Sequence, residues 1–397
     1  MARYPTYAPD FRVLINGQGL PAAVRATVAS LRYEDGMDAS DRVEIQLANP
    51  DLRWLQRHIK GLGFSPPTGI DIGPVRVAEA APDGTFDIDN QLRLQIGYAP
   101  DPLDEVFKGD VTGVEVTFPN GGMPMLTLVA HDYLQRLSRG SVARGFGPLQ
   151  DALVAIILGA ENLLIPMIDP ALVAAGAALT ALNVVFNGTG TKQGAPGSGQ
   201  TDLQLLQQIA AKYDANFWVD GDIIYLSRFL KEYEPRLTLT WGESLLDFSP
   251  KISTVGQVAA VSMKFNLRVI PLDFLVSVFW DFDRECVGIS IVPGVAAAAT
   301  PAFSGPSLSI VDQPISCPAD LVNSALVIYS KLRDKLNSRL TGSGSAIGDP
   351  RIRAGAMIQL DGLGPDFSGN YRVSNATHSI DDGGYKTNFQ VYKEILP

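Results

Sequence analysis

The sequence contains few of the residues from which disulfide frameworks and metal sites are built. Its 397 residues include two cysteines, Cys286 and Cys317, and three histidines. Two cysteines form at most one bridge, so a disulfide scaffold is excluded and we expect the chain to fold in the cytosol. The histidines, His58, His131 and His378, lie in unrelated segments without another ligand at metal-binding spacing. We therefore predict no metal site and a structural role for each histidine.

Signatures of common enzyme sites are also missing. Residues 188–192 (GTGTK) lack the G-x-x-x-x-G-K-[ST] spacing of a phosphate-binding loop, and no apolar strand leads into them. There is no G-x-S-x-G elbow, and neither cysteine has a plausible base nearby in the sequence. Whether two acidic residues form a glycosidase pair depends on their separation in space, which the sequence leaves open. We predict a protein that is not an enzyme, with no catalytic residue and no cofactor.

Long hydrophobic runs are absent as well. The most apolar stretch, 152–186, is divided by charged residues and prolines into halves of about nine and about sixteen residues. Both halves are shorter than the ~20 residues that cross a bilayer, so we predict buried helices and no stable membrane span. Residues 1–5 (MARYP) carry no apolar signal core, so secretory export is not indicated.

The overall composition is that of a globular, acidic protein. Hydrophobic residues make up 46% of the chain and charged residues 19%, which is enough apolar material for more than one core. The formal net charge is −10, which opposes binding to a phosphate backbone over the whole surface. We expect two or three domains and no specific binding of nucleic acid.

Apolar residues alternate with polar ones through much of the first 135 residues, which is typical of half-buried strands. The alternating sets are Val24, Ala26 and Val28; Val43, Ile45 and Leu47; Leu92, Leu94 and Ile96; Val114, Val116 and Phe118; and Leu126 and Leu128. Between the first two sets, residues 34–36 (EDG) look like a turn. Stretches rich in proline, glycine and aspartate, such as 63–74 and 81–89, separate the second set from the third.

The middle of the chain changes character. Segments 152–160 and 171–186 favour helices, and a loop rich in glycine and serine follows at 188–199. Thr201 and Gln204 then form a capping box at the start of an amphipathic helix that ends near residue 213. After it, Asp220-Gly221 joins two apolar runs and gives the strongest hairpin signal in the sequence.

The last part of the chain returns to strands. Segments 237–241, 246–250 and 258–265 have strand character, and we expect them to begin a second barrel. An insertion over 267–340 interrupts it, with a hairpin over 274–291 and a helix whose apolar positions run from Leu321 to Leu336. Short strands joined by glycine-containing turns then complete the barrel over 341–397, with His378 near a strand end.

The C-terminal turns and strands carry a recognisable set of motifs. In order they are Gly348-Asp349-Pro350, Gly355, Leu360-Asp361-Gly362-Leu363-Gly364, Phe367-Ser368-Gly369-Asn370-Tyr371-Arg372-Val373, His378 and Gly384-Tyr385-Lys386-Thr387. This run resembles the C-terminal signature of the phage late control D family, the hub proteins of contractile tails, which recurs in the hub part of VgrG-type spike proteins. A second match lies far from it, at Ile96-Gly97-Tyr98, Val106-Phe107-Lys108-Gly109 and Ala130-His131-Asp132.

The resemblance implies a fold that is mainly β with α+β insertions, containing two tail-tube-like β-barrels and a helix-hairpin domain. We expect the first barrel over 1–138 and the helical and helix-hairpin domain over 139–230. The second barrel would take 231–266 and 341–397, with the insertion over 267–340. The resemblance is weakest in that insertion.

The resemblance also implies a function. The chain would be a non-enzymatic baseplate hub of a contractile phage tail or related injection system, made in the bacterial cytoplasm and assembled into the particle. Its expected partners are two further copies in a homotrimer, a ring of tail tube protein, a trimeric spike and other baseplate proteins. The sequence ends soon after the hairpin near residue 390, so we expect the spike to be a separate chain.

Two alternatives from other classes remain open. A tail-tip cell-wall hydrolase would have to carry its active site in the short insertion. A carbohydrate-binding β module would use exposed aromatics, for which the tryptophans Trp54, Trp218, Trp241 and Trp280 are candidates. The last three lie in apolar strand patterns, so we expect them to be buried instead.

Overall fold

The computed structural model describes residues 8–37, 39–48, 85–139, 151–170, 172–173, 200–213, 215–227, 233–253, 260–267, 272–281, 286–293, 307–315, 329, 332–333 and 335–394. Strands dominate these residues, and the predicted fold class, mainly β, is confirmed. His58, Trp54, Cys317, the loop 188–199 and most of 171–186 and 321–336 lie outside the described residues. The last two apolar positions of the expected C-terminal helix, Leu332 and Leu336, are buried.

One mostly antiparallel sheet runs through much of the molecule, and its thirteen strands come from both ends of the chain. Its parallel pair is β11 with β18. The first strand set is β1 (Ala8–Ile15), β2 (Gln18–Gly19), β3 (Val28–Gly36), β4 (Arg42–Ala48), β5 (Gln91–Ala99), β6 (Asp104–Thr117) and β7 (Met125–Asp132). The second strand set is β11 (Thr238–Thr240), β12 (Leu245–Ile252), β17 (Leu340–Ile347), β18 (Met357–Asp361), β19 (Gly369–Asp381) and β20 (Gly384–Tyr392).

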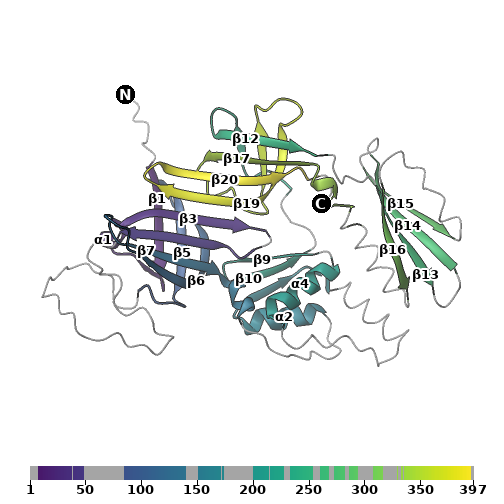
Figure 1. Ribbon diagram of the computed structural model, residues 1–397, viewed down its shortest axis with the longest axis horizontal. Helices are drawn as coiled ribbons and strands as arrows, with labels where there is room; N and C mark the ends of the chain where they lie inside the picture. The colour runs from purple at the N-terminus through teal and green to yellow at the C-terminus, as the bar shows by residue number, and fades with distance from the viewer. Residues whose placement is uncertain are drawn as a thin grey trace.

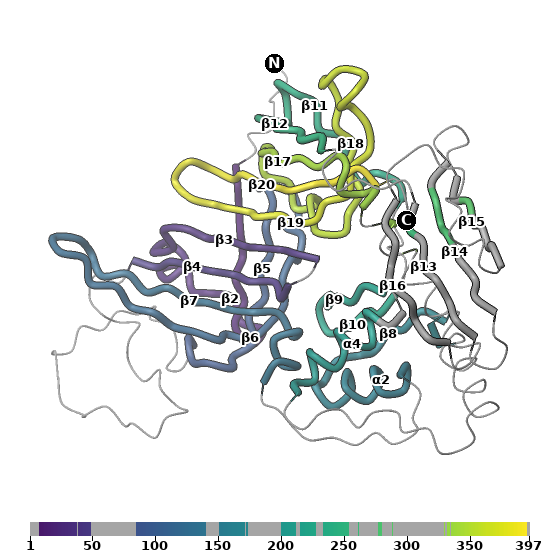
Figure 2. Tube along the Cα trace, turned by 45° about the vertical axis from the view of Figure 1, so that its right-hand side comes forward, coloured from purple at the N-terminus to yellow at the C-terminus, as the bar shows by residue number. Residues whose placement is uncertain are grey.

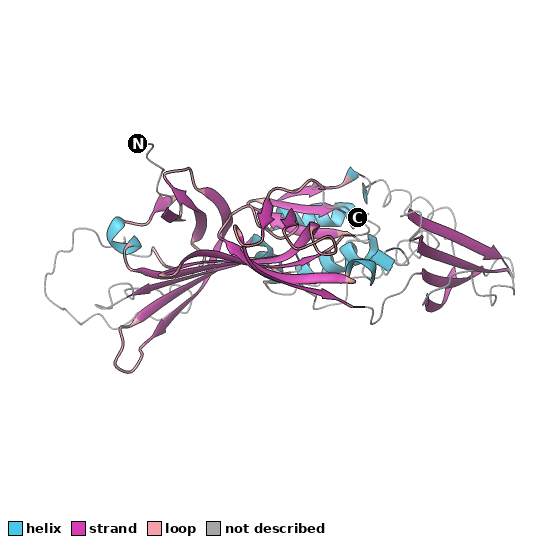
Figure 3. Ribbon diagram, turned by 90° about the horizontal axis from the view of Figure 1, so that it is seen from above, coloured by secondary structure: helices cyan, strands magenta, loops and turns pink. Residues whose placement is uncertain are grey.

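The two strand sets meet where β19 pairs with β3, and we call this pair the seam (Figure 1). The pairing is antiparallel and extends from Asn375 opposite Gly36 to Ile380 opposite Leu31. Seen from above, the strands twist steadily as the sheet passes from one set to the other (Figure 3). We expected a turn at residues 34–36, but these are the last residues of β3.

Each strand set encloses a hydrophobic core. The first core contains the alternating residues of the sequence, among them Val43, Ile45 and Leu94, and the C-terminal Ile380 and Tyr385 also pack into it. The second core gathers residues such as Leu239, Ile358 and Tyr371. The C-terminal strands thus contribute to both cores, which binds the two ends of the chain together.

A small α/β unit packs beside the seam, and we call it the helical unit (Figure 2). It consists of α2 (Asp151–Glu161), β8 (Ile165–Ile168), α4 (Asp202–Tyr213), β9 (Asn216–Asp220) and β10 (Ile223–Ser227), preceded by the 3₁₀ helix η2 (Tyr133–Ser138). Its strands form a three-stranded sheet in the order β8-β10-β9. Residues of α2, α4, η2 and one face of that sheet share a third core.

Two local predictions in the helical unit are confirmed. The backbone N–H of Gln204 donates to Thr201 Oγ1 at 3.2 Å, and the Thr201 N–H donates to Gln204 Oε1 at 3.0 Å, so the capping box starts α4. Gly221 has a φ of +59° between β9 and β10, a left-handed conformation that glycine adopts without strain. The predicted hairpin is therefore present.

A separate four-stranded sheet is built from β13 (Ala260–Leu267), β14 (Leu272–Asp281), β15 (Cys286–Pro293) and β16 (Ser307–Ile315). The expected hairpin is the antiparallel pair β14 and β15. The segment 258–265, which we expected in the second barrel, differs from the prediction: β13 pairs with β14 and β16 instead. Its strand character was visible in the sequence, but its partner strands depend on tertiary contacts.

Among the described residues, none of the helices has both the length and the apolar character needed to cross a bilayer.

Gly109 in β6 marks a close approach between backbones. A Cβ atom placed on it would overlap the carbonyl oxygen of His131 on the neighbouring strand β7. We predict that Gly109→Ala lowers the free energy of unfolding by roughly 1–3 kcal/mol, because the overlap must be relieved by moving backbone. Urea unfolding measures the change.

Gly113→Ala is the matched control on the same strand. The nearest atom to a Cβ at Gly113 is Val129 Cβ at 3.6 Å, an ordinary contact. This variant should stay within about 1 kcal/mol of the wild type, since Gly to Ala in a strand also gains propensity. Equal losses in both variants would show that the close approach at Gly109 does not matter.

Candidate functional site

The seam places Tyr33 of β3 directly opposite His378 of β19. Both side chains are fully buried, and their rings stack at a centroid distance of 5.6 Å with an interplanar angle of 17°. Burial raises the pKa of the Tyr33 hydroxyl, so the group stays protonated and donates to Asp41 Oδ2 at 2.8 Å. The seam therefore carries polar groups through an otherwise apolar interior.

We expected His378 near a strand end, but it lies inside β19. Its Nε2 is 3.0 Å from the Ile352 carbonyl oxygen and its Nδ1 is 2.9 Å from the Tyr385 hydroxyl. Burial lowers the pKa of His378 to about 4, so the imidazole is neutral near pH 7, with Nε2 donating and Nδ1 accepting. This ring is a fixed hydrogen-bonding element of the core, closed to solvent.

The C-terminal motif residues surround His378. The Tyr385 ring lies against Gly348, where a Cβ atom would overlap it, and the Asp349 N–H donates to Thr387 Oγ1 at 3.2 Å. Thr387 Oγ1 is also 3.1 Å from His378 Nδ1. The Gly-Asp-Pro turn and the Gly-Tyr-x-Thr hairpin, far apart in the motif, are thus two sides of one hydrogen-bonded cluster.

Arg353 connects the seam to the helical unit. It lies between β17 and β18, and its Nε donates to Asp35 at 3.2 Å while its Nη2 donates to the Tyr33 hydroxyl at 3.2 Å. Its Nη1 is 3.8 Å from Asp220 at the end of β9. One guanidinium group therefore contacts the first strand set and the helical unit from the second strand set.

We call Tyr33, Asp35, Asp41, Asp132, Asp220 and Arg353 the junction cluster. Asp35, Asp41 and Asp132 are buried, with 7%, 8% and 6% of their surface exposed. Burial first, and then the charges of Asp35 and Asp132, raises the pKa of Asp41 well above its usual value. Burial raises the pKa of Asp132 to about 7, although hydrogen bonds from Ser40 and the backbone oppose this. The cluster therefore contains more carboxyl groups than the neighbouring cations and hydrogen-bond donors keep ionised.

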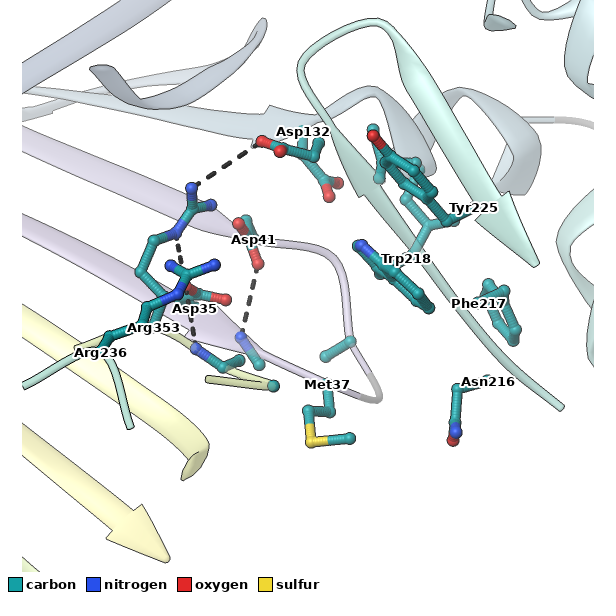
Figure 4. Close-up of a pocket in the computed structure, with 17 residues that line it drawn as sticks. Asp35, Met37, Asp41, Asp132, Asn216, Phe217, Trp218, Tyr225, Arg236 and Arg353 are labelled. Atoms are coloured by element: carbon teal, nitrogen blue, oxygen red, sulfur yellow. Dashed lines mark hydrogen bonds and ion pairs between the residues drawn. The ribbon is translucent and has the colours of Figure 1, made fainter. Parts of the chain in front are cut away.

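A cavity of about 260 Å³ opens beside the cluster, where the three parts of the molecule meet. It is lined by Asp35 at the end of β3 and Asp41 just before β4, and by Arg236 and Arg353 from the second strand set. Figure 4 shows these charged groups on one side of the cavity and the rings of Trp218 and Tyr225 on the other. Those two rings stack at 5.0 Å with an interplanar angle of 9°.

Two of the three tryptophans that we expected to be buried, Trp218 and Trp241, have a described side chain, and the side chain of Trp280 lies outside the described ones. Trp218 is half-buried, but Trp241 is 60% exposed, so the prediction that it is buried is wrong. Trp241 follows the short strand β11, and Gly242, with φ +84°, turns the chain directly after it. The apolar pattern ends there, which leaves the ring outside. Trp218 and Trp241 lie on different sheets and form no common platform.

The second histidine that the structure describes, His131, is also held by a neighbouring side chain. His131 Nδ1 is 2.7 Å from Thr112 Oγ1, and burial lowers the pKa of His131. No group of three or more metal-ligating side chains occurs in the part of the chain that the structure describes. The predicted absence of catalytic and cofactor sites stays a prediction.

Sequence reasoning missed the junction cluster because its residues share no motif, and Arg353 and Tyr33 are 320 residues apart.

Removing Arg353 should weaken the junction strongly. Arg353→Ala would leave Asp35, which is 7% exposed, without its ion-pair partner. We expect the free energy of unfolding to fall by about 3 kcal/mol, since a buried carboxylate that loses its partner keeps its desolvation penalty. Urea unfolding measures this loss.

Arg351→Ala is the control for the same loop. Arg351 is 57% exposed and pairs with Asp349, two residues away. Exposed pairs of this kind contribute less than about 1 kcal/mol, so this variant should remain close to the wild type. A loss at Arg353 no larger than that at Arg351 would contradict the role of the cluster.

Asp132 should make stability depend on pH. Its folded pKa of about 7 lies above the value of 3.8 for a free carboxyl, so folding favours the protonated form. The stabilisation is therefore complete at low pH and is lost as pH rises through about 7. Asp132→Asn imitates the neutral group and still accepts from Ser40, so it should be more stable than the wild type at about pH 8, by on the order of 1–3 kcal/mol.

Urea unfolding of both proteins between about pH 5 and pH 8 measures this difference. The advantage of Asp132→Asn should shrink as pH falls. An Asn variant that is less stable than the wild type at about pH 8 would mean that the carboxylate is favourably solvated in the cluster.

No protein-family model matches the chain, and a comparison with curated proteins finds no similar sequence. Solved structures do match. The 43 kDa tail protein of prophage MuSo2 from Shewanella oneidensis is similar with a TM-score of 0.59 and 11% identity, over 97% of this chain and 98% of that one. The tail protein from Neisseria meningitidis MC58 is similar with a TM-score of 0.57 and 12% identity, over 98% and 97%.

A third similar structure is the E. coli c3393 protein, described as a component of the type VI secretion system with structural similarity to the T4 bacteriophage tail proteins gp27 and gp5. It has a TM-score of 0.50 and 12% identity over 97% of this chain and 78% of that one. Membership of the late control D family stays a prediction. At these identities the comparisons establish the fold: along nearly its whole length, this chain has the fold of phage tail proteins.

Proposed function

We propose that this chain is the structural hub of a baseplate, in a contractile phage tail or a related injection system. The observation that carries the proposal is the likeness to two phage tail proteins over at least 97% of this chain, with no large part left unmatched on either side. The motifs at 348–387 and 96–132, which resemble the late control D family, support the same role. The hub acts by binding other proteins and performs no reaction.

In the proposed hub, the two strand sets are two tube-like barrels. The first barrel would be 1–138 and the helical unit 139–230. We expected the second barrel over 231–266 with 341–397 and the insertion over 267–340. Because β13 pairs with β14 and β16, we now propose that the insertion begins before β13. Each strand set has its own core, and the seam fixes one against the other. Three copies of a chain with two such barrels present six similar surfaces, which suits a contact with a six-fold ring.

The proposed partners are those that the resemblance to the late control D family implies. A ring of tail tube protein would contact one face of the trimer, and a trimeric spike, as a separate chain, would contact the other. Other baseplate proteins would surround it in the particle. An acidic chain with a net charge of −10 would also bind transported DNA weakly.

Light scattering on the purified chain tests the proposal. We expect a trimer with three times the 42.6 kDa mass of one chain, or a monomer that forms a complex of three and three with the spike protein encoded nearby. The spike protein of an unrelated tail is the control and should leave the mass unchanged. A stable monomer that ignores its neighbouring spike protein would contradict the hub.

A further inference from the structure

In the described part of the chain, helices pack on only one face of the three-stranded sheet of the helical unit. Val219, Ile224 and Leu226 point into the core shared with α2 and α4. Figures 1 and 2 both show the two helices on the same side of β9 and β10. The other face is turned towards the seam and carries the side chains that alternate with these core residues.

The strand register shows which side chains share this uncovered face. Met167, Tyr225 and Trp218 are direct neighbours across the three strands. Ile165, Ile223 and Asp220 form the next row. Ile165 is 59% exposed and Met167 is 48% exposed, although both are large apolar residues. An apolar stripe thus runs from the β8 edge to the stacked Trp218 and Tyr225 rings.

At the β9 edge this stripe ends in the cavity of the junction cluster. Four aspartates and two arginines line that cavity. Arg353 is engaged with Asp35, Tyr33 and Asp220. Within the described residues, neither Asp41 nor Asp132 forms an ion pair with a basic side chain. The cavity is therefore rich in acceptors and carries more acidic than basic groups, next to a flat aromatic surface.

We propose that this face binds a segment of a partner protein by one arginine side chain, flanked by apolar residues. The guanidinium group would enter the cavity against the Trp218 ring and face the carboxyl groups of Asp41 and Asp132. The neighbouring apolar side chains of the segment would cover Ile165 and Met167. Burial raises the pKa of Asp41 and Asp132 and so favours their protonated form, whereas a guanidinium group entering the cavity would favour their ionised form, so a cation that meets these two carboxyl groups is matched by charge once bound. Together with the exposed apolar stripe, this defines the occupant.

Arginine fits this surface better than lysine for two physical reasons. Its planar guanidinium stacks on aromatic rings and donates along two directions to carboxyl oxygens. It is also more weakly hydrated than an ammonium group, so it enters a partly desolvated site more readily. Both properties match a cavity that has an aromatic wall and a carboxyl wall. Binding needs only a single chain, so the inference goes beyond the proposed hub and does not depend on trimer formation.

The test uses a fluorescein-labelled peptide with one arginine between leucines, and fluorescence anisotropy with the full chain. The comparison peptide carries citrulline, the neutral isostere, in place of arginine. We expect the arginine peptide to bind at least about tenfold more tightly, as for a desolvated cation beside an aromatic ring, and its affinity to fall with added salt. A lysine peptide should bind with intermediate affinity.

Two variants test whether the arginine peptide binds to the uncovered face of the three-stranded sheet. Trp218→Ala and Asp220→Lys should each weaken the arginine peptide by roughly tenfold. Trp241→Ala, which removes an exposed tryptophan from a different sheet, should bind as the wild type does. Far-UV circular dichroism checks that each variant is folded, which matters most for Asp220→Lys because Asp220 lies 3.8 Å from Arg353 in the junction cluster.

Three outcomes would overturn the proposal. The first is no binding of the arginine peptide to the wild-type chain, and the second is equal binding of the arginine and citrulline peptides. The third is binding of a chito-oligosaccharide that Trp218→Ala abolishes while the arginine peptide is unaffected, which would assign the aromatic face to sugar. The result of the light-scattering experiment changes none of these readings.

Discussion

The pairing of β19 with β3 is the contact on which the rest of the structure depends. It joins strands from the two ends of the chain into one sheet and brings Ile380 and Tyr385 into the core of the first strand set. It also stacks His378 on Tyr33, and this places the Tyr33 hydroxyl within reach of Arg353. Without the seam, Ile380 and Tyr385 would not reach the core of the first strand set, and the junction cluster would lose the residues of one of its sides.

The junction cluster shows why charges are kept inside this molecule. A well-packed apolar junction can be as stable as a buried ion pair, because desolvation offsets most of the electrostatic gain. Apolar contacts are non-directional, however, whereas the bonds of Arg353 to Asp35 and Tyr33 have fixed lengths and angles. The cluster therefore sets the orientation of three parts that apolar packing alone would hold less specifically. The cavity lies where the surfaces of these three parts leave space between them.

Local features of the fold could be predicted from the sequence, and contacts between distant segments could not. The alternation of Val43, Ile45 and Leu47 predicted β4, and the capping box at Thr201 predicted the start of α4, because both depend on neighbouring residues. The same reasoning read residues 34–36 as a turn, since only the partner strand β19 extends β3 to Gly36. It placed β13 in the wrong sheet for the same reason. The C-terminal motifs were visible in the sequence, but their shared contact with His378 appeared only in three dimensions.

The seam has a consequence for the order of events during synthesis. Tyr33 and Arg353 are 320 residues apart, so the ribosome has made the first strand set long before β19 emerges. Until then β3 is an edge strand with unpaired backbone groups, a surface on which nascent chains can associate. The outward side chains of β3 include Arg32 and Glu34, which form an ion pair along the strand. Charges at an edge discourage pairing between chains, and Arg32 and Glu34 place such charges on β3 for the time that the sheet topology leaves it without its partner strand.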